Sequence, residues 1–241
     1  MSVSFFEERA DRPGPWNAGP DPQWEAPRPA REPVFNNGAW YVLLMVAVVV
    51  GGYALQSRLP PGLVAAFYFV PADLLHGRWE TALTAVFLHG NWTHALFNAA
   101  FLLAFGTPVA RMLGLGLRGA LAFLGFYVLT GVLANLAFAA VHWGSEIAVV
   151  GASGAVSALM AAAARVMAGR GRLGPVFARF VLTMGAAWVL VNALIAVVLA
   201  QLGNEILPGT GGAGVAWEAH IAGFVLGALL ISPFAWLAGR R

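Results

Sequence analysis

The sequence predicts an all-α integral membrane protein with six transmembrane helices and a membrane-associated first loop. Hydrophobic residues make up 59% of the 241 residues and charged residues only 10%, whereas a soluble domain carries roughly 25% charged residues. Apolar runs long enough to cross a bilayer occur six times. Arginines gather in alternate connections between these runs, which is the pattern of loops on one side of a membrane.

Each apolar run is interpreted as one transmembrane helix, because about 20 helical residues cross the hydrocarbon core. The helices are expected at about 39–57, 92–113, 117–140, 151–169, 176–201 and 217–238. The connection between the first two runs differs from the others. Its apolar part, 61–70, is too short to span and is framed by prolines. We therefore expect this first loop to lie in or on the membrane interface.

The arginines predict the orientation of the bundle. All 14 basic residues are arginine. Only Arg58 and Arg78, in the long first loop, lie on the opposite side from the others. Because positively charged loops stay in the cytoplasm, both chain termini are expected to be cytoplasmic.

Residues 1–38 are predicted to form a flexible cytoplasmic tail, and residues 39–241 the helical domain. The tail holds seven of the 14 prolines, mixed with charges of both signs. Such a segment cannot bury enough apolar surface to fold alone. A short partner-binding stretch that uses Trp16 and Trp24 is the alternative interpretation.

Four polar side chains are predicted to lie inside apolar helices, where they are costly and therefore indicate function. At ~1.5 Å rise per residue, Ser153 lies roughly 25 Å from Arg170, near the cytoplasmic end of the same helix. His94, Asn98 and His220 lie roughly 20 to 30 Å from the arginines of their own helices. In a core of ~30 Å, all four are in the outer half. Three helices are therefore expected to bring polar groups to one level.

The spacing of small residues predicts contact between the fourth and sixth helices. Small side chains let two membrane helices approach closely. Ser157 and Ala161 lie on the same helix face as Ser153. Gly223 and Gly227 lie on the same helix face as His220.

The residues that are missing restrict the chemistry. The six predicted helices contain no Asp, and their only Glu is Glu218 at the start of the last one. Asp73 is the last Asp of the chain, which excludes a protease with paired aspartates. The chain has no cysteine and no HExxH motif, which excludes a thiol nucleophile and that class of zinc protease. A Ser153–His220 dyad remains, in which the histidine takes the proton of the attacking hydroxyl. The backbone N–H of Ser153 and the side chains of His94 and Asn98 are candidate oxyanion donors. This chemistry requires no metal or cofactor.

The motifs that carry these residues resemble those of the rhomboid intramembrane serine proteases, in their basic six-helix bacterial form. They are HGNWTHALFN at 89–98, GASG at 151–154 and AHIAGFVLG at 219–227. The resemblance implies a six-helix rhomboid-like bundle with Ser153 as nucleophile and His220 as base. It also implies an oxyanion hole made by His94, Asn98 and the backbone N–H of Ser153.

Other residues are expected to support the site. The resemblance implies a structural role for His89, and we expect the same of Gly151, Gly154, Ser157, Gly223 and Gly227. Many relatives carry an aromatic residue at the position of Ser157. We expect Ser157 to bond its own helix backbone, and His220 to be held by packing around Gly223. Asn135 and Asn192 are expected to be interhelical hydrogen-bonding residues.

The predicted function is cleavage of single-pass transmembrane proteins, near the outer face of a bacterial inner membrane. The protein is expected to contact the lipid bilayer and its substrates, and no nucleic acid. The main alternative is a catalytically silent rhomboid-like protein that binds membrane clients. A proton-coupled transporter that uses His94 and His220 is a further alternative. Paired acids or an internal repeat would favour it, and neither is evident.

Overall fold

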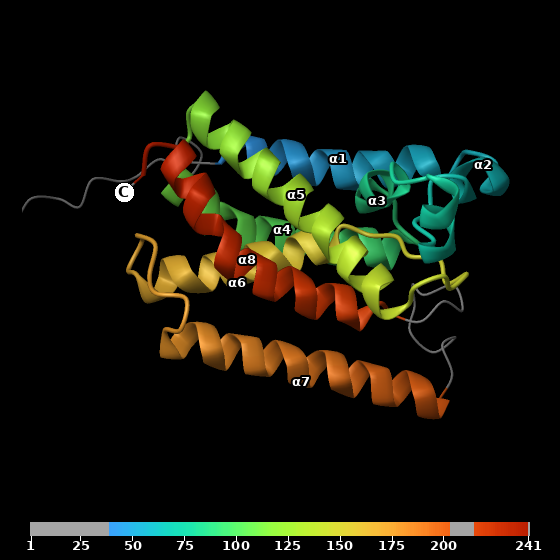
Figure 1. The fold of residues 1–241 in the computed structure, drawn as a ribbon. Helices are drawn as coiled ribbons and strands as arrows, with labels where there is room; N and C mark the ends of the chain where they lie inside the picture. The colour runs from blue at the N-terminus through green and yellow to red at the C-terminus, as the bar shows by residue number, and fades with distance from the viewer. Residues whose placement is uncertain (1–38, 203–214, 241) are drawn as a thin grey trace, which may run out of the picture. The chain divides into compact units, whose positions relative to one another are not determined.

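The structure is a computed structural model that describes residues 39–202 and 215–240, and these ranges are built from helices (Figure 1). The long helices are α1 (Trp40–Gln56), α4 (Trp92–Leu113), α5 (Leu117–Val141), α6 (Ser153–Ala168), α7 (Arg179–Leu202) and α8 (Trp217–Leu237). Between α1 and α4 lie the short helices α2 (Pro61–Ala65), η1 (Pro71–His76), α3 (Thr81–Thr84) and η2 (Ala85–Phe87). The described ranges contain no β-strand, and the predicted tail lies outside them.

The predicted helical membrane bundle is confirmed, with a helix in each of the six expected segments. Four of the helices, α4, α5, α7 and α8, are long and apolar enough to cross a membrane. The helices α1 and α6 are apolar but have only 17 and 16 residues. At ~1.5 Å per residue α6 extends about 24 Å, which is less than the ~30 Å hydrocarbon core.

The starts of two helices differ from the predicted bounds. Helix α6 begins at Ser153 instead of residue 151, because Gly151 has a φ of 130°, which is incompatible with a helix. Helix α7 begins at Arg179 instead of residue 176, after a turn in which the Ala178 N–H bonds the Pro175 carbonyl at 3.2 Å. Ser153 is therefore the first residue of its helix.

Helix α6 forms the interior of the bundle. It packs against α4, α5, α7 and α8, and every residue from Gly154 to Val166 is buried. Six of these thirteen residues are alanine, and small side chains allow neighbouring helices to approach closely. Because protein surrounds α6 on most sides, it does not need the full length of a lipid-exposed span.

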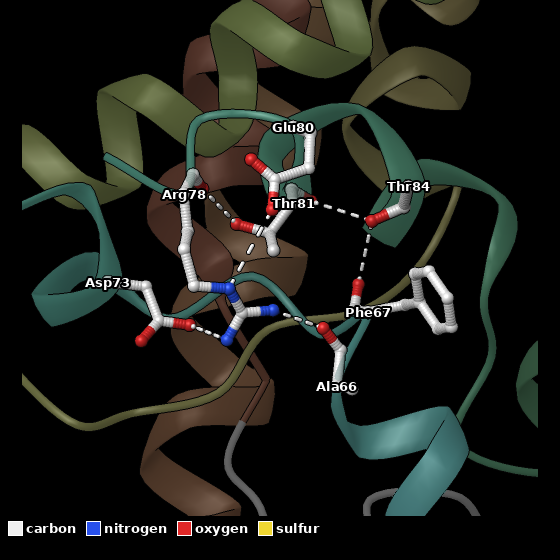
Figure 2. A network of polar contacts seen from close by, with 7 residues as sticks. All are labelled: Ala66, Phe67, Asp73, Arg78, Glu80, Thr81 and Thr84. Carbon is white, nitrogen blue, oxygen red and sulfur yellow. Dashed lines mark hydrogen bonds and ion pairs between the residues drawn. The ribbon is translucent and has the colours of Figure 1, made fainter. Parts of the chain in front are cut away.

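The first loop is held together by Arg78 (Figure 2). Its Nη1 pairs with the Asp73 carboxylate at 2.8 Å, and its Nη2 donates to the carbonyl of Ala66. The Thr84 hydroxyl adds a bond of 2.9 Å to the carbonyl of Phe67. These bonds fold the loop back on itself, and its short helices form the connection from α1 to α4.

The first loop also positions the segment that enters α6. Phe69 and Val149 form an antiparallel bridge, with N–H to carbonyl distances of 3.1 and 2.8 Å. Two residues later, the Gly151 N–H bonds the carbonyl of Ala85 at 2.9 Å. The backbone before Ser153 is therefore anchored at two points.

Candidate catalytic site

Ser153 lies at the start of α6, after a glycine that has two roles. The φ of 130° at Gly151 is strongly disfavoured for a residue with a side chain. A Cβ at Gly151 would also lie 2.7 Å from the ring of His94. Glycine therefore permits both the turn into α6 and the approach of His94. At this helix start, the first backbone N–H groups have no intrahelical acceptor.

The structure brings Ser153 and His220 into direct contact. The Ser153 Oγ lies 2.8 Å from the His220 Nε2, and both side chains are partly buried. One residue comes from α6 and the other from the first turn of α8. This is the distance expected between a nucleophile and its base.

The contact depends on a close approach of the α6 and α8 backbones, which we call the α6–α8 seam, made by Gly154 and Ala158 against Gly223 and Gly227. A Cβ at Gly223 would collide with the backbone of Gly154, and one at Gly227 with the backbone of Ala158. The sequence predicted that α6 would meet α8 through the face of Ser153, Ser157 and Ala161. At the closest contact α6 instead uses the next residues along the helix, Gly154 and Ala158. Only residues with little or no side chain allow this approach, which explains the displacement.

A third residue, Asn192 of α7, completes a chain of hydrogen bonds. Its Oδ1 lies 2.8 Å from the His220 Nδ1, and its Nδ2 donates to its own helix at the Trp188 carbonyl, at 2.9 Å. With Oδ1 facing the ring, Nδ1 carries the imidazole proton and Nε2 is left to accept a proton from Ser153. The ring of Trp188 lies near that of His220, with centroids 5.9 Å apart.

The expectation that His220 is held only by packing is therefore wrong. Asn192 was expected to hydrogen-bond between helices, and it does, but its partner is the candidate base. Asn192 lies outside the three motifs, so the motifs did not indicate this contact. The signal that could have found it is an asparagine in the middle of a long apolar run, one turn after a tryptophan.

His94 lies beside Ser153, and its tautomer follows from its contacts. Its ring rests against Gly151, and its Nδ1 accepts the Gly90 N–H at 3.4 Å. This leaves the proton on Nε2, the nitrogen that lies against Gly151. The buried Asn98 is one turn further along α4, where its Nδ2 donates to the His94 carbonyl at 3.1 Å. The second Nδ2 proton of Asn98 remains for another acceptor.

His89 packs beneath this group. It is fully buried, and its ring meets the ring of His94 edge-on, with centroids 5.2 Å apart. Its backbone exchanges two hydrogen bonds with the Gln56 side chain, at 2.6 and 3.0 Å. Burial, with a smaller effect of His94, lowers the pKa of His89 to about 3. At physiological pH His89 is therefore an uncharged ring that packs against His94.

The remaining polar residues are occupied away from the dyad. Ser157 donates to the Ser153 carbonyl at 2.7 Å, which is the bond to its own helix expected from the sequence. Asn135 donates to the Ala82 carbonyl at 2.9 Å and joins α5 to α3. Glu218 pairs with His142 at 2.8 Å. His142 therefore joins the end of α5 to α8.

Comparison with known proteins gives one positive finding. The family model of the Rhomboid domain matches residues 76–236, a range that contains Ser153, His220, His94, Asn98 and Asn192. A search of curated proteins found no match. The matched range covers about two thirds of the chain and includes five of its six long helices. The chain therefore belongs to the rhomboid family.

Proposed function

We propose that the protein is an intramembrane serine endopeptidase in which Ser153 is the nucleophile and His220 the general base. The observation that carries the proposal is the 2.8 Å contact between the Ser153 Oγ and the His220 Nε2. The bond from the His220 Nδ1 to Asn192 supports it, because it leaves Nε2 free to accept the hydroxyl proton.

The proposed reaction has two stages. In the first, Ser153 attacks the carbonyl carbon of a peptide bond while His220 takes its proton, and the imidazolium returns that proton to the leaving amine. In the second, His220 activates a water that hydrolyses the acyl-enzyme, and Ser153 is regenerated. Asn192 keeps the imidazole oriented through both stages.

The oxyanion would be bound by three donors. They are the backbone N–H of Ser153, the Nε2–H of His94 and the second Nδ2 proton of Asn98. Donors that are already in place stabilise the charge that develops in the transition state. His89 and Gly151 support this group, since they hold the ring of His94 from two sides.

Asn192 occupies the position that an aspartate has in a Ser-His-Asp triad, but it is neutral. The one carboxylate near His220 in sequence, Glu218, is paired with His142. A neutral partner orients the ring and fixes its tautomer. It gives the imidazolium less electrostatic stabilisation than a carboxylate would.

The substrates are proposed to be single-pass transmembrane proteins. Ser153 lies at the end of the bundle that holds the first loop, and the other polar groups of the site lie there too. A substrate helix must unwind locally at this level, because a helical peptide bond is shielded by its own turn. The arginine pattern supports a site near the outer face of a bacterial inner membrane, with both termini in the cytoplasm.

The decisive test measures covalent labelling and cleavage together. The purified protein should react with a serine-directed fluorophosphonate at Ser153 alone, and it should cleave members of a panel of labelled single-pass proteins in liposomes. Ser153→Ala and His220→Ala should each reduce cleavage to background, since loss of either member of such a unit costs roughly 10⁶-fold in the best-studied case.

The alternative function is binding of membrane clients without cleavage. It predicts that wild-type protein captures single-pass proteins, leaves them intact and does not react with the probe. Cleavage that persists in Ser153→Ala would contradict the proposed nucleophile.

A further inference from the structure

The structure contains a basic cavity at the end of the bundle opposite Ser153. It has a volume of about 730 Å³ and lies where α4 and α8 end and the connection from α6 to α7 passes. Three arginines line it, Arg111, Arg172 and Arg240. They come from three separate segments of the chain, so the cavity exists only in the folded bundle.

The walls of the cavity are tied together by a fourth, buried arginine. Arg165 donates to the carbonyls of Gly174 at 2.9 Å and Ala228 at 2.7 Å, and to the hydroxyl of Ser232 at 2.9 Å. Ser232 itself lines the cavity. Arg165 thus joins the α6–α7 connection to α8 and adds a positive charge behind the cavity wall.

This end of the bundle carries no described carboxylate. The four Asp and Glu residues within 39–202 and 215–240 are all in or next to loops at the Ser153 end: Asp73, Glu80, Glu146 and Glu218. Among the described residues, the Arg111 guanidinium makes no hydrogen bond or ion pair. Within the described part of the chain, the Arg240 side chain donates only to the Leu113 carbonyl, at 3.3 Å. The charge of the cavity therefore suits an anion.

A second, more apolar cavity joins the first and indicates what kind of anion. It has a volume of about 330 Å³ and shares Arg111, Met112 and Gly171 with the basic cavity. It extends along α4 to Ala104, which is roughly 10 Å further from the helix end at ~1.5 Å per residue. Val166 of α6 lines its other side. A ligand that fills both cavities has an anionic head and an apolar tail.

The level of the cavity agrees with a lipid headgroup. The exposed tryptophans Trp40 and Trp236 lie at the same end of the bundle, at the start of α1 and the end of α8. Trp40 also bonds the Leu115 carbonyl, in the connection after α4, at 2.9 Å. Exposed tryptophans in membrane helices mark the headgroup region.

We propose that this cavity binds one anionic glycerophospholipid, with its phosphate at Arg111, Arg172 and Arg240 and an acyl chain between α4 and α6. Basic pockets between membrane helices bind anionic headgroups in this way. The bound lipid links α4, α8 and the α6–α7 connection. It stabilises the bundle through mass action, because the unfolded chain has no such site.

The test measures lipid binding to the full-length protein, purified without lipid in a neutral detergent. Native mass spectrometry counts bound phosphatidylglycerol or phosphatidylcholine, and a thermal shift is recorded with each lipid and with inorganic phosphate at equal concentration. We expect one retained phosphatidylglycerol and a rise in melting temperature that neither phosphatidylcholine nor phosphate reproduces.

Two variants locate the site. The double variant Arg111→Gln/Arg240→Gln should bind phosphatidylglycerol at least tenfold more weakly. The matched control is Arg118→Gln, which removes an exposed arginine at the same end but outside the cavity, and it should bind as wild type does. Equal weakening by both variants, or none by the double variant, would overturn the proposal. A shift with phosphate as large as that with the lipid would assign the cavity to a free anion instead.

Discussion

The α6–α8 seam and helix α7 differ sharply in how they are packed. In α6 every residue from Gly154 to Val166 is buried, and its backbone touches that of α8. In the spanning part of α7 only 11% of the residues are buried, against 50% in α5. Ser153 and His220 lie next to the seam on the same two helices, whereas Asn192 and Trp188 belong to α7. The distance between the proposed nucleophile and base is therefore set by tight backbone contact, and the orientation of the His220 ring by a loosely packed helix.

The physical reason lies in the side chains. The seam is made of glycine and alanine, and backbones in contact gain dispersion and leave no room for displacement. Helix α7 instead exposes large aliphatic residues such as Leu190 and Leu194. Lipid tails are as apolar as these side chains, so burying the side chains inside the bundle gains no free energy from the hydrophobic effect. Polar contacts such as the Asn192–His220 bond then contribute a larger share of what holds α7.

The largest effect is expected from breaking the seam. Gly223→Val places side-chain atoms where the Gly154 backbone lies, so α6 and α8 cannot approach and both the fold and cleavage should be lost. Gly52→Val in α1 is the matched control, because a Cβ there meets nothing within 4 Å. Thermal unfolding in detergent and substrate cleavage measure the two outcomes. A stable, active Gly223→Val protein would show that the seam does not set the Ser153–His220 distance.

The next effect concerns His94 and Asn98 of α4, the proposed oxyanion donors. His94→Ala and Asn98→Ala should each lower kcat by about 10²- to 10³-fold, the range for loss of one donor. KM should change less, because the donors act mainly on the transition state. Steady-state kinetics with one transmembrane substrate separates these parameters. A rise in KM alone would make that residue a binding element.

A smaller effect is expected when the contact from α7 is removed. A hydrogen bond to a charged group contributes about 1.5–3 kcal/mol, so Asn192→Ala should lower kcat by roughly 10- to 100-fold. Asn192→Asp retains an oxygen acceptor for the His220 Nδ1 and should recover part of this loss, which a merely structural role would not predict.

The control for this prediction also lies on α7. Thr183 is exposed, and its hydroxyl donates to the Phe180 carbonyl of its own helix. Thr183→Ala should retain full cleavage. If Thr183→Ala and Asn192→Ala were equally impaired, the defect would come from α7 as a whole and not from the bond to His220.

The smallest effect is expected at Ser157. Its hydroxyl bonds the Ser153 carbonyl, and among the described residues no group of α7 or α8 is its hydrogen-bond partner. Ser157→Ala should keep cleavage within about threefold, which is under ~1 kcal/mol. A hundredfold loss with unchanged thermal stability would show that Ser157 belongs to the reacting group.

The sequence by itself determined the class of the protein and the elements that carry its site. Long apolar runs must become helices in a membrane, because backbone groups there have no water to bond. The six helices therefore appear where the runs are, and the order of three motifs identified the family. The residues Ser153, His220, His94 and Asn98 stood out because polar groups are rare in such helices.

Only the tertiary structure decided how these residues meet. The φ of 130° at Gly151 moves the start of α6 to Ser153, and this conformation depends on contacts with His94 and Ala85. The register of the seam is displaced by one residue from the predicted face, because it depends on which backbone positions of both helices lack side chains. The spacing of residues along one helix shows which of them share a face. It does not show how the faces of two helices pack against each other.

The role of Asn192 and the basic cavity were equally beyond the sequence. Asn192 lies 28 residues from His220 in sequence, and nothing local shows which helix its side chain faces. Arg111, Arg172 and Arg240 come from three segments, and their grouping follows from where those segments end in space. Local physics determines which segments are helical, whereas contacts between distant residues depend on the packing of the whole bundle.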